Sequence, residues 1–135
     1  MRKLLGCFLV ALGLMATSAM AGSGNQFLET VKHNIKLTCD TDSNACTYQA
    51  WNKPRLVGQG RPDIQLRGEK QPWKCYVSEG NIYPALLYAF MSGDMAIKIS
   101  DRCTADGKFN GKADGQLWVE VNGKVKSRYW ITDWK

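Results

Sequence analysis

The sequence predicts an α+β domain, built mostly of antiparallel β-strands around one amphipathic helix and held by two disulfides. Several segments alternate apolar and polar residues with a period of two, which is typical of half-buried strands. One segment, at about 82–91, repeats its apolar residues with the period of a helix. Four cysteines remain after a predicted leader is removed, and an even number suits two disulfides.

The first 21 residues have the pattern of a secretory signal peptide. Arg2 and Lys3 precede an apolar run over residues 4–15, and small residues at 18–21 favour cleavage after Ala21. We therefore expect residues 1–21 to be removed, Cys7 among them, and residues 22–135 to form one globular domain without a membrane span. The protein is predicted to be exported, to the periplasm or beyond the cell.

Two strands are expected to form a hairpin near the N-terminus, after a loose polar start at 22–26. Residues 31–37 alternate, with Val31, His33, Ile35 and Leu37 on the apolar side, and residues 46–51 follow as a second strand. The polar turn at 40–45 would place Cys39 opposite Cys46, close enough for a disulfide. Four cysteines allow three pairings, and this geometry favours Cys39 with Cys46.

The middle of the chain is predicted to change from irregular structure to strand, helix and strand. Residues 52–72 are rich in proline and glycine, with a short edge strand at Ile64 and Leu66. Residues 73–78 alternate as a strand and residues 95–100 as another. If these two strands are neighbours, Cys75 and Cys103 become partners in the second disulfide.

The helix at 82–91 is predicted from spacing and from its ends. Tyr83, Leu86, Leu87 and Phe90 fall at i, i+3, i+4 and i+7. Asn81 can cap the helix, Pro84 is tolerated in its first turn, and Gly93 can end it.

The last segment is predicted to be a hairpin, residues 116–131, after a polar loop at 104–115. Asn122-Gly123 is a strong turn signal. A two-residue loop would mix core and solvent residues on one face, so a three-residue loop is expected. The inward face would then hold Leu117, Val119, Val121, Val125, Tyr129 and Ile131, and the outward face Trp118, Glu120, Lys126, Arg128 and Trp130.

This outward face is the best candidate for ligand or partner binding, through Trp118, Lys126, Arg128 and Trp130. Exposed indoles beside cations supply flat apolar area together with charge. The alternative is that the loops at 52–72 or 104–115 cover one or both indoles. The chain carries a formal charge of +6, which favours anionic partners but also serves solubility. Export argues against a nucleic-acid partner.

The sequence indicates no metal, no cofactor and no assigned catalytic residue. Disulfide cysteines are not zinc ligands, and His33 is the one histidine. Residues 40–44 match the start of a calcium loop, but Ala45 and Trp51 stand where that loop needs glycine and glutamate.

Catalysis by two acids stays open as an alternative. Asp63 with Asp94 or Glu120 would provide the paired carboxylates that a small secreted hydrolase needs. A single histidine offers no confident serine triad.

Residues 74–77, 82–93 and 95–100 together resemble the binding subunits of bacterial AB5-type toxins, in particular the pertussis and subtilase cytotoxin groups. In those subunits a cysteine-bearing strand precedes an amphipathic helix that ends near glycine, and another strand follows. The resemblance implies a small Greek-key barrel of the oligonucleotide/oligosaccharide-binding type. It also implies a ring of five subunits that recognises glycans without catalysis. No binding residue of that family maps to a numbered position here.

The sequence thus predicts an exported, non-catalytic binding protein that recognises a glycan or a cell-surface partner. The alternative is a periplasmic inhibitor or immunity protein that blocks a cell-wall hydrolase, a lysozyme or an amidase, with the loop at 58–63. A small secreted hydrolase is the second alternative, and a homo-oligomer stays open.

Overall fold

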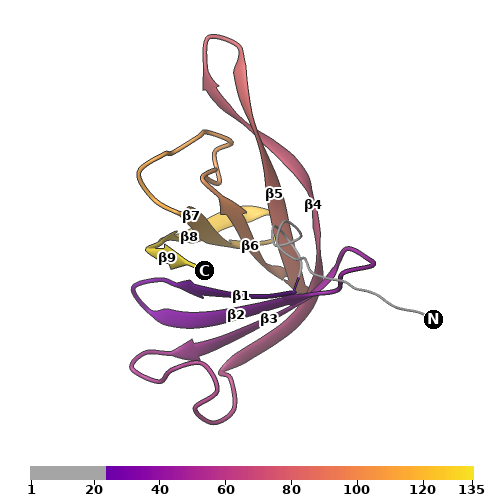
Figure 1. Cartoon of the computed structure of the whole chain (residues 1–135), viewed down its shortest axis with the longest axis vertical. Coiled ribbons are helices and arrows are strands. Elements are labelled where there is room, and N and C mark those ends of the chain that lie inside the picture. The colour runs from indigo at the N-terminus through magenta and orange to yellow at the C-terminus, as the bar shows by residue number, and fades with distance from the viewer. Residues whose placement is uncertain (1–23) are drawn as a thin grey trace, which may run out of the picture.

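The computed structural model describes residues 24–135, which form one antiparallel sheet curled into a nearly closed barrel (Figure 1). The predicted signal peptide, residues 1–21, lies outside the described residues. The sheet order is β8-β7-β6-β5-β4-β3-β2-β1-β9. The strands are β1 (Gly24–Glu29), β2 (His33–Cys39), β3 (Ala45–Asn52), β4 (Ile64–Ser78), β5 (Asn81–Ser92), β6 (Met95–Asp101), β7 (Gly115–Val121), β8 (Lys124–Ile131) and β9 (Asp133–Trp134).

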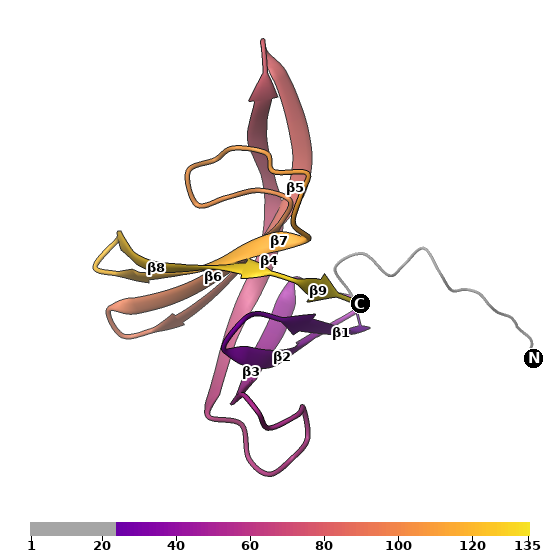
Figure 2. The same ribbon diagram turned by 90° about the vertical axis from the view of Figure 1, so that its left-hand side faces the viewer.

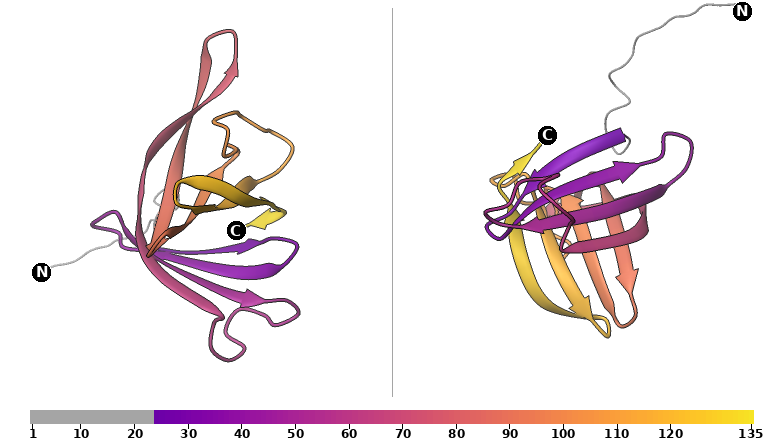
Figure 3. Two further views of the ribbon diagram at one scale, coloured as in Figure 1. Left: turned by 180° about the vertical axis from the view of Figure 1, so that it is seen from behind. Right: turned by 90° about the horizontal axis from the view of Figure 1, so that it is seen from below.

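The barrel closes through the C-terminus. Strand β8 pairs with β7, and the chain then continues as β9, which pairs with β1 (Figure 3). The Thr132 amide donates to the Glu29 carbonyl at 2.8 Å, and Phe27 and Lys135 exchange backbone hydrogen bonds of 3.0 and 2.8 Å. Strands β1 to β8 follow one another around the sheet, so the topology is a meander and the expected Greek key is wrong.

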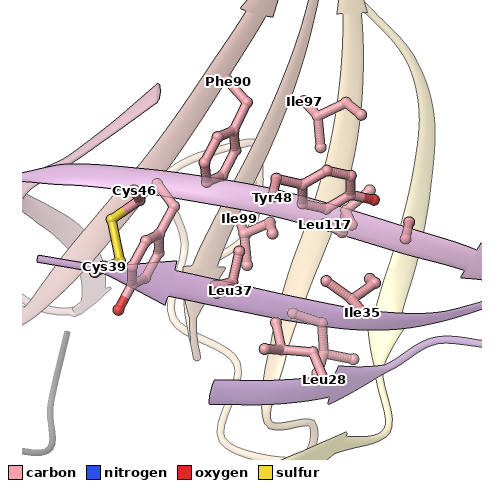
Figure 4. Packing of buried hydrophobic residues seen from close by; sticks show 13 residues of the cluster. Leu28, Ile35, Leu37, Cys39, Cys46, Tyr48, Phe90, Ile97, Ile99 and Leu117 are labelled. Carbon is pink, nitrogen blue, oxygen red and sulfur yellow. A yellow bond between two sulfur atoms is a disulfide. The ribbon is translucent and has the colours of Figure 1, made fainter. Parts of the chain in front are cut away.

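Apolar side chains from all nine strands fill or border the interior, as period-two alternation requires (Figure 4). The predicted strands at 31–37 and 46–51 are confirmed as β2 and β3, although Val31 is exposed in the turn before β2. An eight-stranded barrel is just wide enough for side chains to fill it. The interior residues are Leu28, Ile35, Leu37, Cys39, Cys46, Tyr48, Ala50, Tyr88, Phe90, Ile97, Ile99, Leu117 and Ile131.

The predicted helix at 82–91 is wrong, because this segment is strand β5 and the described residues contain no helix. Tyr88 and Phe90 belong to the interior, whereas Leu87, directly before Tyr88, is buried on the opposite face. A strand buried on both faces loses the alternation of apolar and polar residues. The apolar residues at 83, 86, 87 and 90 therefore had the spacing of a helix. Pro84 is tolerated because β5 gains its second neighbour, β6, only from Leu87 onward. The fold is therefore all-β, not α+β.

Strand β4 joins two segments that the sequence separated, the short strand at Ile64 and Leu66 and the strand at 73–78. Its first part pairs with β3 up to Glu69, and its second part pairs with β5 from Gly68 onward. A Cβ atom at Gly68 would lie 2.0 Å from the Ala89 carbonyl oxygen. Glycine is thus required where β4 passes from one neighbour to the other.

Both predicted disulfides are confirmed. Cys39 and Cys46 are bonded and lie directly opposite each other on β2 and β3. Cys75 on β4 is bonded to Cys103, just after β6, across a Cα–Cα distance of 5.9 Å. Two disulfides are typical of proteins that fold in an oxidising compartment outside the cytoplasm. Residues 24–135 include no helix that is long and apolar enough to span a membrane.

The hairpin at Asn122-Gly123 is confirmed, but its loop is not the predicted three residues. Both turn residues have positive φ, 54° and 80°, and Val121 pairs directly with Lys124. The register then shifts between Val119 and Glu120, which leaves Lys126 as an extra residue on β8. This bulge, not the loop, returns Leu117 and Tyr129 to the inward face.

The predicted loose N-terminus at 22–26 is wrong for residues 24–26, which belong to β1. A short polar strand carries little apolar signal of its own, and its partners lie in β2 and at the far end of the chain.

Candidate functional site

A pocket of about 270 Å³ opens at the end of the barrel where β6 ends and β7 begins. We call it the end pocket. Barrel mouths are frequent ligand sites, and pockets for drug-sized ligands span about 300–1,000 Å³. The end pocket therefore suits a ligand about as large as one sugar ring. Its lining residues are Gln26, Leu86, Tyr88, Asp101, Arg102, Asp114 and Trp134.

One side of the end pocket is aromatic and depends on barrel closure. The Trp134 indole N–H donates to the Gln26 side-chain oxygen at 2.8 Å, and the Gln26 amide donates to the Tyr88 hydroxyl at 3.2 Å. The Tyr88 and Trp134 ring centroids are 6.0 Å apart. A Cβ atom at position 115 would approach the Trp134 ring to 3.1 Å, so Gly115 gives the indole room. Burial raises the pKa of Tyr88 above its usual value.

The other side of the end pocket is charged. Asp101 accepts hydrogen bonds from the Leu86 amide at 3.3 Å and from the Tyr83 hydroxyl at 3.4 Å. Burial, and then the Asp101 charge, raises the pKa of Tyr83. The backbone N–H of Arg102 donates to the Asp114 carbonyl at 3.2 Å, which closes the base of the β6–β7 loop. Asp101, Arg102 and Asp114 thus line the pocket together with the two rings.

This arrangement can bind a small polar ring. Carboxylate, guanidinium and amide groups are planar and can each form paired hydrogen bonds with neighbouring hydroxyls. The flat face of an indole can cover the apolar face of the same ring. Within residues 24–135, no three His, Cys, Asp or Glu side chains come together as a metal site.

The predicted outward face is wrong in one of its two indoles. Trp118 is only 2% exposed, and its ring packs against Trp73 with centroids 5.7 Å apart. Its indole N–H donates to Glu120 at 3.0 Å, and Glu120 also pairs with Lys98 at 3.1 Å. The prediction of an exposed Trp118 is therefore wrong, and the ring packed against it is that of Trp73 on β4.

The rest of the predicted face is exposed but dispersed. Trp130 is 47% exposed and Lys126 is exposed on β8. Arg128 is engaged by the β6–β7 loop, through two hydrogen bonds of 3.0 and 3.1 Å to Asp106. Of the two indoles and two cations predicted for this face, only the indole of Trp130 and the ammonium group of Lys126 are therefore free.

The loop at 58–63, predicted as an inhibitory probe, is fixed by its own contacts. Arg55 donates to the carbonyls of Gln59 and Arg61 at 3.2 and 2.9 Å, and it pairs with the Asp63 carboxylate. The Asn52 amide and Arg55 lower the pKa of Asp63. The indole of Trp51 donates to the Gly60 carbonyl at 3.0 Å. Asp63 and Glu120, proposed as members of a carboxylate pair, are thus each bound to a cation.

The end pocket could not be assembled from the sequence. Gln26 and Trp134 are 108 residues apart and meet only because β9 closes the barrel on β1. The one local signal was the placing of Asp101 and Arg102 at the end of a predicted strand, where polar side chains often reach a barrel mouth.

Comparisons with known proteins give no independent identification: no family model, no curated protein and no solved structure matches this chain.

Proposed function

We propose that this chain is a non-catalytic binding protein that recognises a saccharide through the end pocket. The observation that supports this is that Trp134 and Tyr88 line one small pocket together with Asp101, Arg102 and Asp114. The glycan ligand expected from the sequence is retained, and its site moves from the outer face of β7 and β8 to the barrel mouth. The two disulfides favour a protein that works outside the cytoplasm.

The toxin-subunit resemblance adds nothing to this proposal. It depended on a helix at 82–91, and that segment is strand β5. Neither a ring of five subunits nor the glycans of that family are therefore proposed here.

A glycan array followed by calorimetry tests the proposal. The purified protein is applied to the array, and the best-bound glycan is titrated against wild type and three variants. We expect Trp134→Ala and Asp114→Ala to weaken binding about tenfold or more, a loss of about 1.4 kcal/mol. Trp130→Ala is the matched control, because it removes an exposed indole outside the pocket, and it should bind as wild type does.

Two results would overturn the proposal. One is an array without a bound glycan, and the other is glycan binding that Trp130→Ala weakens and the two pocket variants do not. Thermal melting separates a folding defect from a binding defect. Trp134→Ala could disturb the fold, because Trp134 also takes part in closing the barrel. Asp114→Ala then still tests the pocket.

A further inference from the structure

The distal half of the β4–β5 hairpin projects from the barrel (Figures 1 and 2). Pairing of β4 with β3 ends at Glu69, and pairing of β5 with β6 begins at Leu87. In between, β4 and β5 pair only with each other in the sheet, up to a two-residue turn at Glu79 and Gly80. We call residues 74–84 the prong.

The prong carries a cluster of exposed apolar side chains. Tyr76, Val77 and Ile82 are 52%, 41% and 57% exposed, and Tyr76 lies directly opposite Ile82. Single exposed apolar residues are ordinary on a protein surface. Tyr76 and Ile82 lie on one face of the prong and Val77 on the other. Apolar groups on both faces of one narrow projection are of the kind that marks an interaction site.

The prong is rigid up to these residues. The Cys75–Cys103 disulfide fixes its base. Tyr76 donates its amide to Gly107 at 2.8 Å and accepts from Phe109 at 2.9 Å, so the β6–β7 loop holds both its backbone groups. The Tyr83 and Phe109 rings lie 4.9 Å apart. At the tip, the Glu79 amide donates to the Tyr76 hydroxyl at 2.8 Å. A segment ordered in advance loses little entropy on binding.

The positions of polar and apolar side chains along the prong indicate what kind of partner it can bind. The outermost residues, 78–81, are polar and exposed and include the carboxylate of Glu79, while the apolar residues lie behind them. A membrane surface would receive Glu79 first, and a carboxylate in hydrocarbon is costly. Two copies joined tip to tip would bury only one face of each narrow tip, short of the roughly 800 Å² per partner of a stable interface, whereas a cleft contacts both faces and the end of the tip.

We propose that the prong inserts into a cleft of a different protein. The turn at Glu79 and Gly80 reaches a cleft floor that carries a cation or hydrogen-bond donors for the Glu79 carboxylate. Tyr76, Val77 and Ile82 then pack against apolar walls and exclude water from that contact. An enzyme inhibitor is one kind of protein that binds in this way. The inserted segment would then be the β4–β5 hairpin and not the loop at 58–63, which was predicted from the sequence.

Photocrosslinking in the protein's native cells, followed by titration, tests this inference. Ile82 is replaced by p-benzoylphenylalanine, and the matched control carries the same residue at Met91, which is 61% exposed at the other end of β5. We expect position 82 to capture one protein through residues that line a cleft, and position 91 to leave it uncaptured.

The captured protein is then purified and titrated with variants of this chain. Glu79→Lys and Ile82→Ser should each weaken binding about tenfold or more, and Met91→Ser should leave it unchanged. Lipid or self adducts at position 82, equal capture at both positions, no adduct, or full affinity of both prong variants would each overturn the inference. Asp114→Ala should leave the capture unchanged, which separates this site from the end pocket.

Discussion

The barrel wall is packed on both of its faces, but in different ways. The interior is filled by alternating side chains from strands around the barrel, such as Ile35, Tyr48 and Phe90. On the outside lies what we call the outer layer, a group of buried and half-buried residues around the Cys75–Cys103 disulfide and the Trp73–Trp118 contact: Trp73, Cys75, Leu87, Cys103, Gln116 and Trp118. The interior follows from local periodicity, whereas the outer layer depends on one long loop and one disulfide.

The largest expected effect on stability comes from removing a large side chain from either face of the barrel wall. Trp118→Ala should lower the free energy of unfolding by about 3–5 kcal/mol, as should Phe90→Ala in the interior, because each leaves a large cavity. Trp130→Ala should change it by less than about 0.5 kcal/mol, since that indole is half exposed. Urea denaturation measures all three. Equal stability of Trp118→Ala and Trp130→Ala would show that the outer layer is not a true core.

The two disulfides give the next comparison. In the loop-closure treatment, with sequence separations of 28 and 7, the Cys75–Cys103 bond contributes about 3.6 kcal/mol and the Cys39–Cys46 bond about 2.4 kcal/mol. The double variants Cys75→Ser/Cys103→Ser and Cys39→Ser/Cys46→Ser should reproduce this order in urea. Hydrogen exchange adds a second measurement: the first variant should expose the amides of Tyr76 and Phe109 while β2 and β3 stay protected.

The same division explains how much of the fold the sequence could predict. Strands buried mainly on one face, such as β2 and β3, were predicted within a residue or two, and so were both disulfides. The two main errors, a helix at 82–91 and an exposed Trp118, have one cause. Leu87 and Trp118 are buried from outside by parts of the chain that are distant in sequence, which no local period records.

The candidate site was harder to predict than the fold. Its Asp101 and Asp114 flank the β6–β7 loop, but Gln26 and Trp134 come from the two ends of the described chain. Their meeting depends on barrel closure, and closure was not part of the sequence prediction. Trp130, by contrast, was correctly placed on an exposed face.

Gly68 lies where the barrel wall gives way to the hairpin, and its replacement tests how tightly that junction is packed. Gly68→Ala should cost roughly 1–3 kcal/mol, because the new methyl group would meet the Ala89 backbone and the Phe90 ring. Gly111→Ala is the control, since its methyl group would meet only the Phe109 ring, at 3.1 Å, and a ring can shift. Thermal melting should rank the two variants, and equal melting temperatures would contradict a tight junction.

The smallest expected effect belongs to His33, which lies near the seam between β8 and the β1–β2 turn and belongs to neither packed region. Its ring meets the Tyr129 ring edge-on, with centroids 6.2 Å apart. Burial and the charge of Lys32 lower the pKa of His33 below 6.5, while Asn52 and Asp63 act weakly in the opposite direction.

A lowered pKa in the folded state means that the unfolded chain takes up a proton first as the pH falls. Stability should therefore be independent of this group above about pH 7 and should decrease as the pH falls from 6.5 through the folded-state pKa. His33→Gln removes the titrating group, so its stability should fall less between pH 7 and pH 5 than that of wild type in parallel urea titrations. Equal slopes for the two proteins would mean that His33 is as well solvated in the fold as in the unfolded chain.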